Sequence, residues 1–161
     1  MNKSALADYT YYVRKHNPTV IYDSVATNPE RLKKIRNFNC MARDIAAESI
    51  PQWLFVTPNL VNDAHDTPVE YGAQWLQSWL IPLLNDPIVN NDRTLVVMTY
   101  DEDGTDGAPD NNKISTILLG GAIPEHLRGT TDSTVYTHYS HMSSVQANFA
   151  TDCLGRGDTD P

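Results

Sequence analysis

Short apolar runs along the chain alternate with segments of helical spacing. The β-branched run VIYDSV at 20–25 and the compact run WLFV at 53–56 are typical of strands. The run TLVVMTY at 94–100 is almost continuously apolar, which predicts a strand buried on both faces. The run ISTILLGG at 114–121 predicts another strand that ends in a glycine pair. These four runs predict a sheet.

Helices are predicted between and after these strands. Asn28 followed by Pro29 has the form of an N-cap and first helical position for ERLKKIRNF. The segment NCMARDIAAESI at 39–50 predicts a further short helix. The residues TPVE at 67–70 have the form of a capping box with proline at the first helical position. The helix that follows carries a broad apolar stripe of Tyr71, Trp75, Leu76, Trp79, Leu80, Leu83 and Leu84.

The segment YTHYSHMSSVQANF at 136–149 predicts a last amphipathic helix, with Met142, Val145 and Phe149 on its buried side. Strands that alternate with helices predict an α/β layer structure with a largely parallel sheet. The chain shows no internal repeat, and its length suits one domain, so we interpret residues 1–161 as a single domain.

Charge and length exclude several classes of function. The 161 residues carry a formal net charge of −8 and a pI of about 4.9. No basic stripe is available to neutralise phosphates, which argues against nucleic acid or an anionic membrane as partner. No apolar window is long enough to span a membrane.

The N-terminal segment lacks the apolar core of a signal peptide, so the chain is either intracellular or a piece of a longer precursor. Cys40 and Cys153 lie far apart without CxxC spacing, which argues against a zinc site. They either form one disulfide or stay free, and the sequence leaves both open.

Two of the predicted strands lead into polar clusters. WLFV is followed by Asp63, His65 and Asp66, and TLVVMTY by Asp101 and Glu102. In open parallel α/β sheets, ligands bind beyond the carboxyl ends of the strands. If the two strands are parallel, both clusters emerge at the same edge of the sheet.

Such a convergence favours a cation and phosphoryl chemistry. Neighbouring carboxylates repel, and a divalent metal ion relieves that repulsion. Carboxylate and imidazole groups suit Mg²⁺, Ca²⁺, Mn²⁺ or Zn²⁺. A metal there would polarise a phosphoryl oxygen while His65 protonates a leaving group.

Purely structural interpretations remain open. Asp63 or Asp66 can cap a helix, His65 can be a turn residue, and the acidic run at 101–103 can be a solvated surface. The segment 101–110 resembles a loose calcium loop but lacks the EF-hand spacing and its closing glutamate. His138 and His141 have i, i+3 spacing on the last predicted helix, which fits either ligands or packing.

Several long motifs in one order resemble the fungal secreted acid phosphatases. The motifs are IYDSVATNPERLKKIRNF, PQWLFVTPNLVNDAHDT, TLVVMTYDE, STILLGGAIP, LRGTTDSTVYTHYSHMSSVQANF and LGRGDT. Those enzymes belong to a phosphoesterase family that also contains bacterial non-haemolytic phospholipases C. The resemblance implies an alkaline-phosphatase-like, three-layer α/β/α fold and hydrolysis of phosphate esters as small-molecule substrates. It also implies secretion for the full-length family member.

The resemblance also implies roles for particular residues. In the family, the ND.HD segment supplies active-site groups, which here are Asp63, His65 and Asp66. The TYDE segment supplies carboxylates at a metal or phosphate site. Here these are Asp101 and Glu102, with a divalent metal ion as the implied cofactor. The segment YTHYS implies that His138 belongs to the catalytic groups.

Family members are much longer, so this chain resembles their C-terminal half. Their N-terminal half brings a Glu-Asn metal-binding segment and a serine or threonine nucleophile, and neither is found here. A sheet incomplete on its N-terminal side exposes an edge that invites association with another chain. Two hypotheses follow: an acid-phosphatase-like phosphoesterase, or a catalytically inactive truncated domain that binds a metal or a partner.

Overall fold

The computed structural model describes residues 11–104 and 112–159 of the chain. These form two compact units, a first that runs up to Thr94 and a second that starts at Leu95. Each unit is described by itself below.

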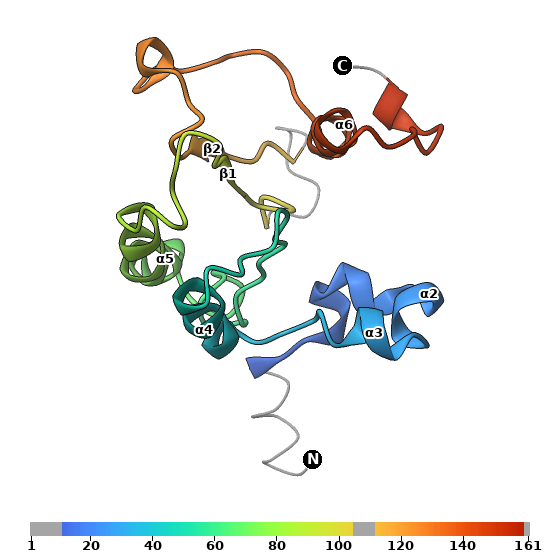
Figure 1. Cartoon of the computed structure of the whole chain (residues 1–161). Coiled ribbons are helices and arrows are strands. Elements are labelled where there is room, and N and C mark those ends of the chain that lie inside the picture. The colour runs from blue at the N-terminus through green and yellow to red at the C-terminus, as the bar shows by residue number, and fades with distance from the viewer. Residues whose placement is uncertain (1–10, 105–111, 160–161) are drawn as a thin grey trace. The chain divides into compact units, whose positions relative to one another are not determined.

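The first unit is built from short helices and one long helix (Figure 1). In chain order, its elements are the 3-10 helices η1 (Arg14–His16) and η2 (Pro18–Ile21), the helices α2 (Asp23–Ala26) and α3 (Pro29–Leu32), the 3-10 helix η3 (Phe38–Cys40), and the helices α4 (Met41–Ala46) and α5 (Val69–Leu84).

The predicted strand at 20–25 is wrong, because this stretch forms the end of η2 and the start of α2. Pro18 occupies the first turn of η2, a position that suits its fixed φ. The backbone N–H groups of Val25 and Ala26 then donate to the carbonyl of Tyr22 at 2.9 Å. The β-branched composition favours a strand here, but local hydrogen bonds satisfy the backbone as helical turns instead.

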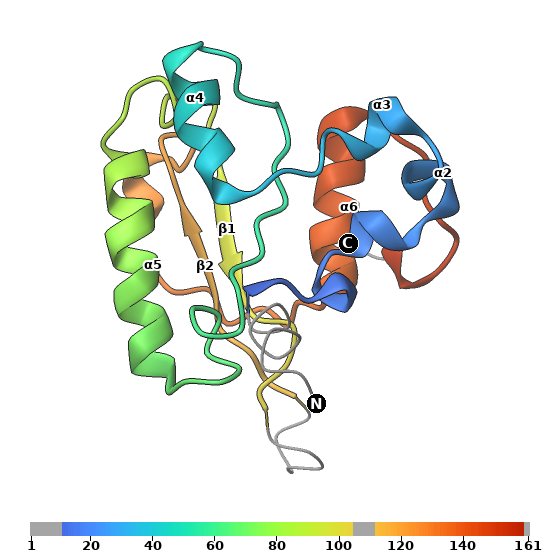
Figure 2. The ribbon, with the colours of Figure 1, turned by 90° about the horizontal axis from the view of Figure 1, so that it is seen from below.

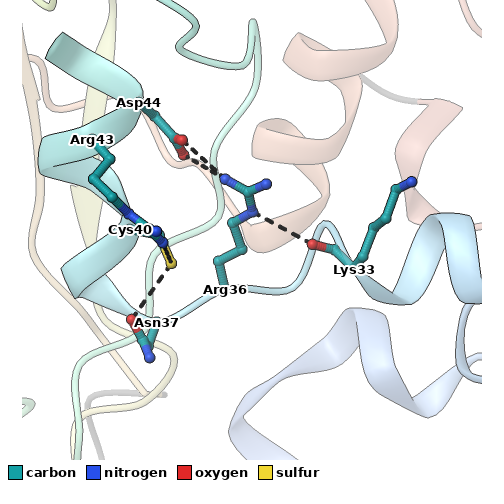
Figure 3. Close-up of polar contacts among 6 residues, drawn as sticks. All are labelled: Lys33, Arg36, Asn37, Cys40, Arg43 and Asp44. Carbon is teal, nitrogen blue, oxygen red and sulfur yellow. Dashed lines mark hydrogen bonds and ion pairs between the residues drawn. The ribbon is translucent and has the colours of Figure 1, made fainter. Parts of the chain in front are cut away.

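The predicted cap at Asn28 is confirmed. Its side-chain oxygen accepts from the backbone N–H groups of Glu30 at 3.0 Å and Arg31 at 3.2 Å. The helix α3 is nevertheless short, and the chain leaves it after Leu32. The guanidinium of Arg36 then binds both carboxylate oxygens of Asp44 at 2.9 and 3.1 Å, which ties this connection to α4 (Figure 3).

The long helix α5 is confirmed, but its predicted capping box is wrong. The side chain of Thr67 donates to the carbonyl of Val61 at 2.7 Å instead of capping the helix. Trp75 and Trp79 stack on one another, with ring centroids 5.8 Å apart. Phe38 meets both rings edge-on, so the aromatic part of the stripe packs against η3. A groove of 410 Å³ lies beside this cluster, and it is lined by Phe38, Asn39, Met41, Ala42, Ile45, Trp79 and Leu83.

The second unit contains two strands, β1 (Val96–Thr99) and β2 (Thr116–Leu119), which lie side by side (Figure 2). They pair antiparallel, with Val96 opposite Leu119. The strand predicted at 53–56, in the first unit, is wrong, because the structure describes this run and it forms no strand. The chain thus has mixed α/β character with a small antiparallel sheet.

The prediction that the run at 94–100 is buried on both faces is wrong. Val97 of β1 is exposed, as are Ile117 and Leu118 of β2. A two-stranded sheet offers too few neighbours to cover its own side chains.

A 3-10 helix η4 (Glu125–Leu127), the helix α6 (His138–Phe149) and a 3-10 helix η5 (Gly157–Thr159) complete the second unit. The start of α6 is fixed by a capping box between Thr137 and Ser140. The side predicted to be buried is partly open to solvent, with Met142 and Val145 36% and Phe149 38% exposed, and Gln146 is the buried residue of this helix.

Asp158 fastens the C-terminal loop to α6. This side chain is only 2% exposed. One carboxylate oxygen accepts from the Gln146 side chain at 2.8 Å, and the other accepts from the backbone N–H of Arg156 at 2.8 Å. The hydrogen bond from Gln146, followed by the one from the backbone of Leu154, lowers the pKa of Asp158 to about 2.

None of the helices within residues 11–104 and 112–159 is long and apolar enough to cross a membrane. The two cysteines, Cys40 and Cys153, are free thiols. The guanidinium of Arg43 lies 3.1 Å from the Cys40 sulfur (Figure 3).

Candidate functional site

The polar cluster of the first unit lies on a turn that its own backbone closes. The backbone N–H of Asn62 donates to two oxygens of Asn59, the carbonyl at 2.9 Å and the side-chain oxygen at 3.0 Å. The N–H of Asp63 also donates to the Asn59 carbonyl, and that of Asp66 to the Leu60 carbonyl. Leu60 is only 1% exposed, so one buried side chain anchors the whole turn.

The turn also depends on close contact with α5. Ala64 adopts φ 72°, a left-handed conformation that non-glycine residues rarely take. A Cβ atom added to Gly72 of α5 would lie 3.2 Å from the Cβ of Ala64 and 3.3 Å from the Asn62 carbonyl oxygen. Gly72 therefore lets the helix backbone approach the turn and support its strained residue.

This turn brings the three predicted residues Asp63, His65 and Asp66 together. One oxygen of Asp63 accepts from the backbone N–H of His65 at 2.8 Å. The ring nitrogen Nδ1 of His65 lies 2.9 Å from a carboxylate oxygen of Asp66. The His65 and Asp66 side chains are 50% and 44% exposed, which keeps them accessible to a ligand.

The pairing with Asp66 gives the two ring nitrogens of His65 different roles. In the tautomer that donates Nδ1–H to the carboxylate, Nε2 is the nitrogen left for a substrate. A histidine oriented by a carboxylate is a common arrangement for proton transfer to or from a reacting group. The geometry can therefore support general acid or base chemistry at Nε2.

Sequence reasoning missed one residue of this cluster, His16 at the end of η1. Its Nδ1 lies 3.8 Å from the second oxygen of Asp63, and its ring centroid lies 6.0 Å from that of His65. His16 lies far from the turn in sequence and has no motif around it. No sequence signal could have found it.

In the second unit, the structure brings Asp101 and His138 together. Asp101 follows β1, and its backbone carbonyl lies 2.9 Å from Nε2 of His138 at the start of α6. Asp101 and Glu102 are both exposed. The rings of His138 and His141 meet edge-on with centroids 6.1 Å apart. Burial, followed by the charge of His138, lowers the pKa of His141 below its ordinary value.

The fit to a metal ion is partial. The carboxylates of Asp101 and Glu102 are the hard oxygen ligands that Mg²⁺ or Ca²⁺ prefers. Across residues 11–104 and 112–159, however, no three His, Cys, Asp or Glu side chains gather closely enough to hold an ion. The calcium-loop interpretation of residues 101–110 falls mostly outside the described residues. The convergence of the two clusters concerns both units and stays a prediction.

Comparison with known proteins confirms the resemblance to fungal acid phosphatases. The chain is 54% identical to an acid phosphatase of Aspergillus fumigatus over 91% of its own length and 32% of that protein. It is 46% identical to a probable acid phosphatase of Kluyveromyces lactis, over 92% of this chain and 35% of the relative. A phosphatidylinositol-3-phosphatase of Mycobacterium tuberculosis is 32% identical over 84% of this chain and 40% of the relative. No solved structure matches the chain.

This chain thus spans about a third of the length of the fungal relatives, although the match covers nearly all of the chain itself. The pattern of one protein family extends over residues 1–151, well beyond the polar turn and both strands. The chain therefore belongs to the Phosphoesterase family.

Proposed function

We propose that this chain takes part in the hydrolysis of phosphate esters, with His65 as the general acid. The observation that carries the proposal is the exposed His65–Asp66 pair, joined at 2.9 Å, on a turn that the backbone holds closed. Family membership and relatives named as acid phosphatases support the same chemistry.

In this proposal, the turn orients one proton toward the substrate. Asp66 fixes the His65 ring through Nδ1–H, so in the doubly protonated ring the proton on Nε2 is the one available to the ester. As a water oxygen bonds to phosphorus and loses its proton to solvent, the bond between phosphorus and the ester oxygen breaks. His65 gives the Nε2 proton to that leaving oxygen, which departs as an alcohol. Asp63 holds the backbone N–H of His65 and is thus an orienting group.

The second cluster would serve a divalent cation. Asp101 and Glu102 would supply two of its oxygen ligands, and a bound cation would stabilise charge on the phosphoryl oxygens. His138 would hold the backbone of Asp101 in place, since its Nε2 lies 2.9 Å from the Asp101 carbonyl oxygen. The candidate cations are Mg²⁺, Ca²⁺, Mn²⁺ and Zn²⁺.

The finer features of the family are part of this proposal. We infer that the longer family protein has the three-layer, largely parallel α/β/α fold and is secreted. The resemblance implies a serine or threonine nucleophile in the N-terminal half of such a protein. With this chain alone, water is the attacking group, so we expect slow turnover. The exposed apolar side chains of β1 and β2 fit sheet faces that a larger protein would cover, and the two-stranded sheet would pair with further strands at its edges.

The substrate class proposed first is a phosphate monoester, following the name of the fungal relatives. The name of the mycobacterial relative adds inositol-lipid phosphates as a second class. A lipid-like, phospholipase C-type diester substrate is the least direct extension, because it rests on the resemblance alone.

The test is hydrolysis of a chromogenic phosphate monoester across acidic pH, with and without a divalent cation. The His65→Ala variant should lower the rate by about 10²- to 10⁴-fold, the range for loss of a general acid. The matched control is His126→Ala on η4, an exposed histidine outside both clusters. An unchanged rate in His65→Ala, or no hydrolysis by the unaltered chain under any condition, would reject the proposal.

A further inference from the structure

The geometry points to His16 as a positioning residue that orients His65 through the carboxylate of Asp63. This inference rests on the proposed function, since it assigns an additional residue to the same site. His16 does not lie on the turn, and it reaches the turn from η1.

The two oxygens of Asp63 have different partners. Oδ1 accepts from the backbone N–H of His65 at 2.8 Å, and Oδ2 lies 3.8 Å from Nδ1 of His16. At 3.8 Å the contact with His16 is longer than a hydrogen bond, and it limits the rotation of the carboxylate by proximity. His16 thereby restrains the side chain whose other oxygen accepts from the backbone N–H of His65.

Burial separates the residues of this cluster into two layers. The His16 and Asp63 side chains are 24% and 17% exposed, whereas those of His65 and Asp66 are about half exposed. A contact between partly charged groups strengthens as water is excluded from it. The His16–Asp63 contact thus suits a supporting role behind the exposed pair that meets the substrate.

The ring of His16 also limits the ring of His65 directly. Their centroids are 6.0 Å apart and their planes are tilted by 55°. His16 thus lies beside the His65 ring, while the bond to Asp66 holds Nδ1. Both contacts favour one orientation of Nε2.

His16 is itself well placed to act as a support. Its backbone N–H donates to the carbonyl of Val13 at 3.0 Å, which closes η1. Val13 is among the few buried apolar residues of the described chain. The side chain of the neighbouring Arg14 donates to the Val20 carbonyl at 3.2 Å, which links η1 to η2.

The experiment compares His16→Ala and His16→Asn, with His126→Ala as the control. Asparagine retains an amide nitrogen near the position of a histidine Nδ1, so it can keep the contact with Asp63. The readouts are the ring nitrogen signals of His65 in long-range ¹H–¹⁵N NMR spectra, recorded with neutral rings, and a titration with inorganic phosphate. Thermal melting of each variant reports whether it is folded.

We expect His65 to show one tautomer, protonated on Nδ1, in the unaltered chain and in His126→Ala. In His16→Ala this signal should average between tautomers, and phosphate should shift it with about tenfold weaker affinity, as for loss of other orienting partners. His16→Asn should restore both readouts.

Two outcomes would overturn the inference. One is an unchanged His65 signal and phosphate affinity in His16→Ala. The other is an equal change in His16→Ala and His16→Asn together with equal losses in melting temperature, which would make His16 a packing residue. If phosphate leaves the His65 signal of the unaltered chain unchanged, the proposed function is in error. The tautomer comparison without phosphate still decides the role of His16.

Discussion

The two candidate clusters differ in how the chain holds them. Asp63 and His65 lie on a turn closed by hydrogen bonds among residues 59–67 and anchored by the buried Leu60. Asp101 follows a two-stranded sheet with exposed apolar side chains and is tied to α6 through its backbone carbonyl. Most contacts that shape the first cluster are local, and His16 and Gly72 add support from two other segments. A cation site, in contrast, needs its ligands themselves to come from several segments.

Removing the anchor of the turn should have the largest effect on stability. Leu60→Ala should lower the free energy of unfolding by about 2–5 kcal/mol, because it leaves a cavity where a fully buried side chain stood. Urea denaturation measures this change. The control Leu54→Ala, at an exposed leucine, should change it by less than about 0.5 kcal/mol. Equal losses in both variants would show that Leu60 has no special role.

Filling the contact between α5 and the turn should have the next largest effect. Gly72→Val places carbon atoms against Ala64 and the Asn62 carbonyl, which already lie within 3.3 Å of a single added Cβ. We expect a loss of about 1–3 kcal/mol in unfolding free energy, the usual cost of overpacking. The loss should be accompanied by changed NMR shifts of His65.

The control for this substitution is Ala73→Val, on the exposed face of the same helix. It carries the same β-branched side chain without the close contact. His65 shifts that stay unchanged in Gly72→Val would contradict the dependence of the turn on Gly72.

The stability of the second unit should fall in acid because of Asp158. Hydrogen bonds lower its pKa to about 2 in the folded chain, from an ordinary value of 3.8. A lowered carboxyl pKa contributes stability that is present above pH 3.8 and is lost as pH falls toward 2. The urea midpoint should therefore drop across this window, and the Asp158→Asn variant should show a smaller drop. Parallel pH profiles for the two proteins would contradict this assignment.

The smallest effect concerns His141 on α6. Burial and the charge of His138 lower its pKa below 6.5, so the stability that it contributes is present above pH 6.5 and declines as pH falls. An NMR titration should show His141 with a midpoint below 6.5. His138→Ala should raise that midpoint only in part, because burial is the larger cause. A midpoint above 6.5 would contradict the packing of α6 described here.

Sequence patterns predicted the features that depend on neighbouring residues. The Asn28 cap and the helices α5 and α6 need only local spacing, and all three were found. The strand predicted at 20–25 failed because local hydrogen bonds satisfied the same residues as helical turns. Thr67 binds the Val61 carbonyl instead of capping α5, since the closed turn brings that carbonyl within reach.

The candidate site shows the same division between local and distant features. Asp63, His65 and Asp66 were visible as a polar run, but His16 joins them only through the folded path of the chain. The left-handed Ala64 and its support by Gly72 are likewise invisible in composition. Contacts between segments distant in sequence are set by packing, which no local pattern encodes.

Leaving-group dependence tests most directly whether His65 donates a proton to the leaving group. The measurement compares hydrolysis of an alkyl phosphate, whose leaving oxygen needs a proton, with that of a dinitrophenyl phosphate, whose leaving oxygen does not. For His65→Ala relative to the unaltered chain, we predict a rate loss of about 10²-fold or more with the alkyl ester and a much smaller loss with the dinitrophenyl ester. Equal losses with both esters would contradict the account.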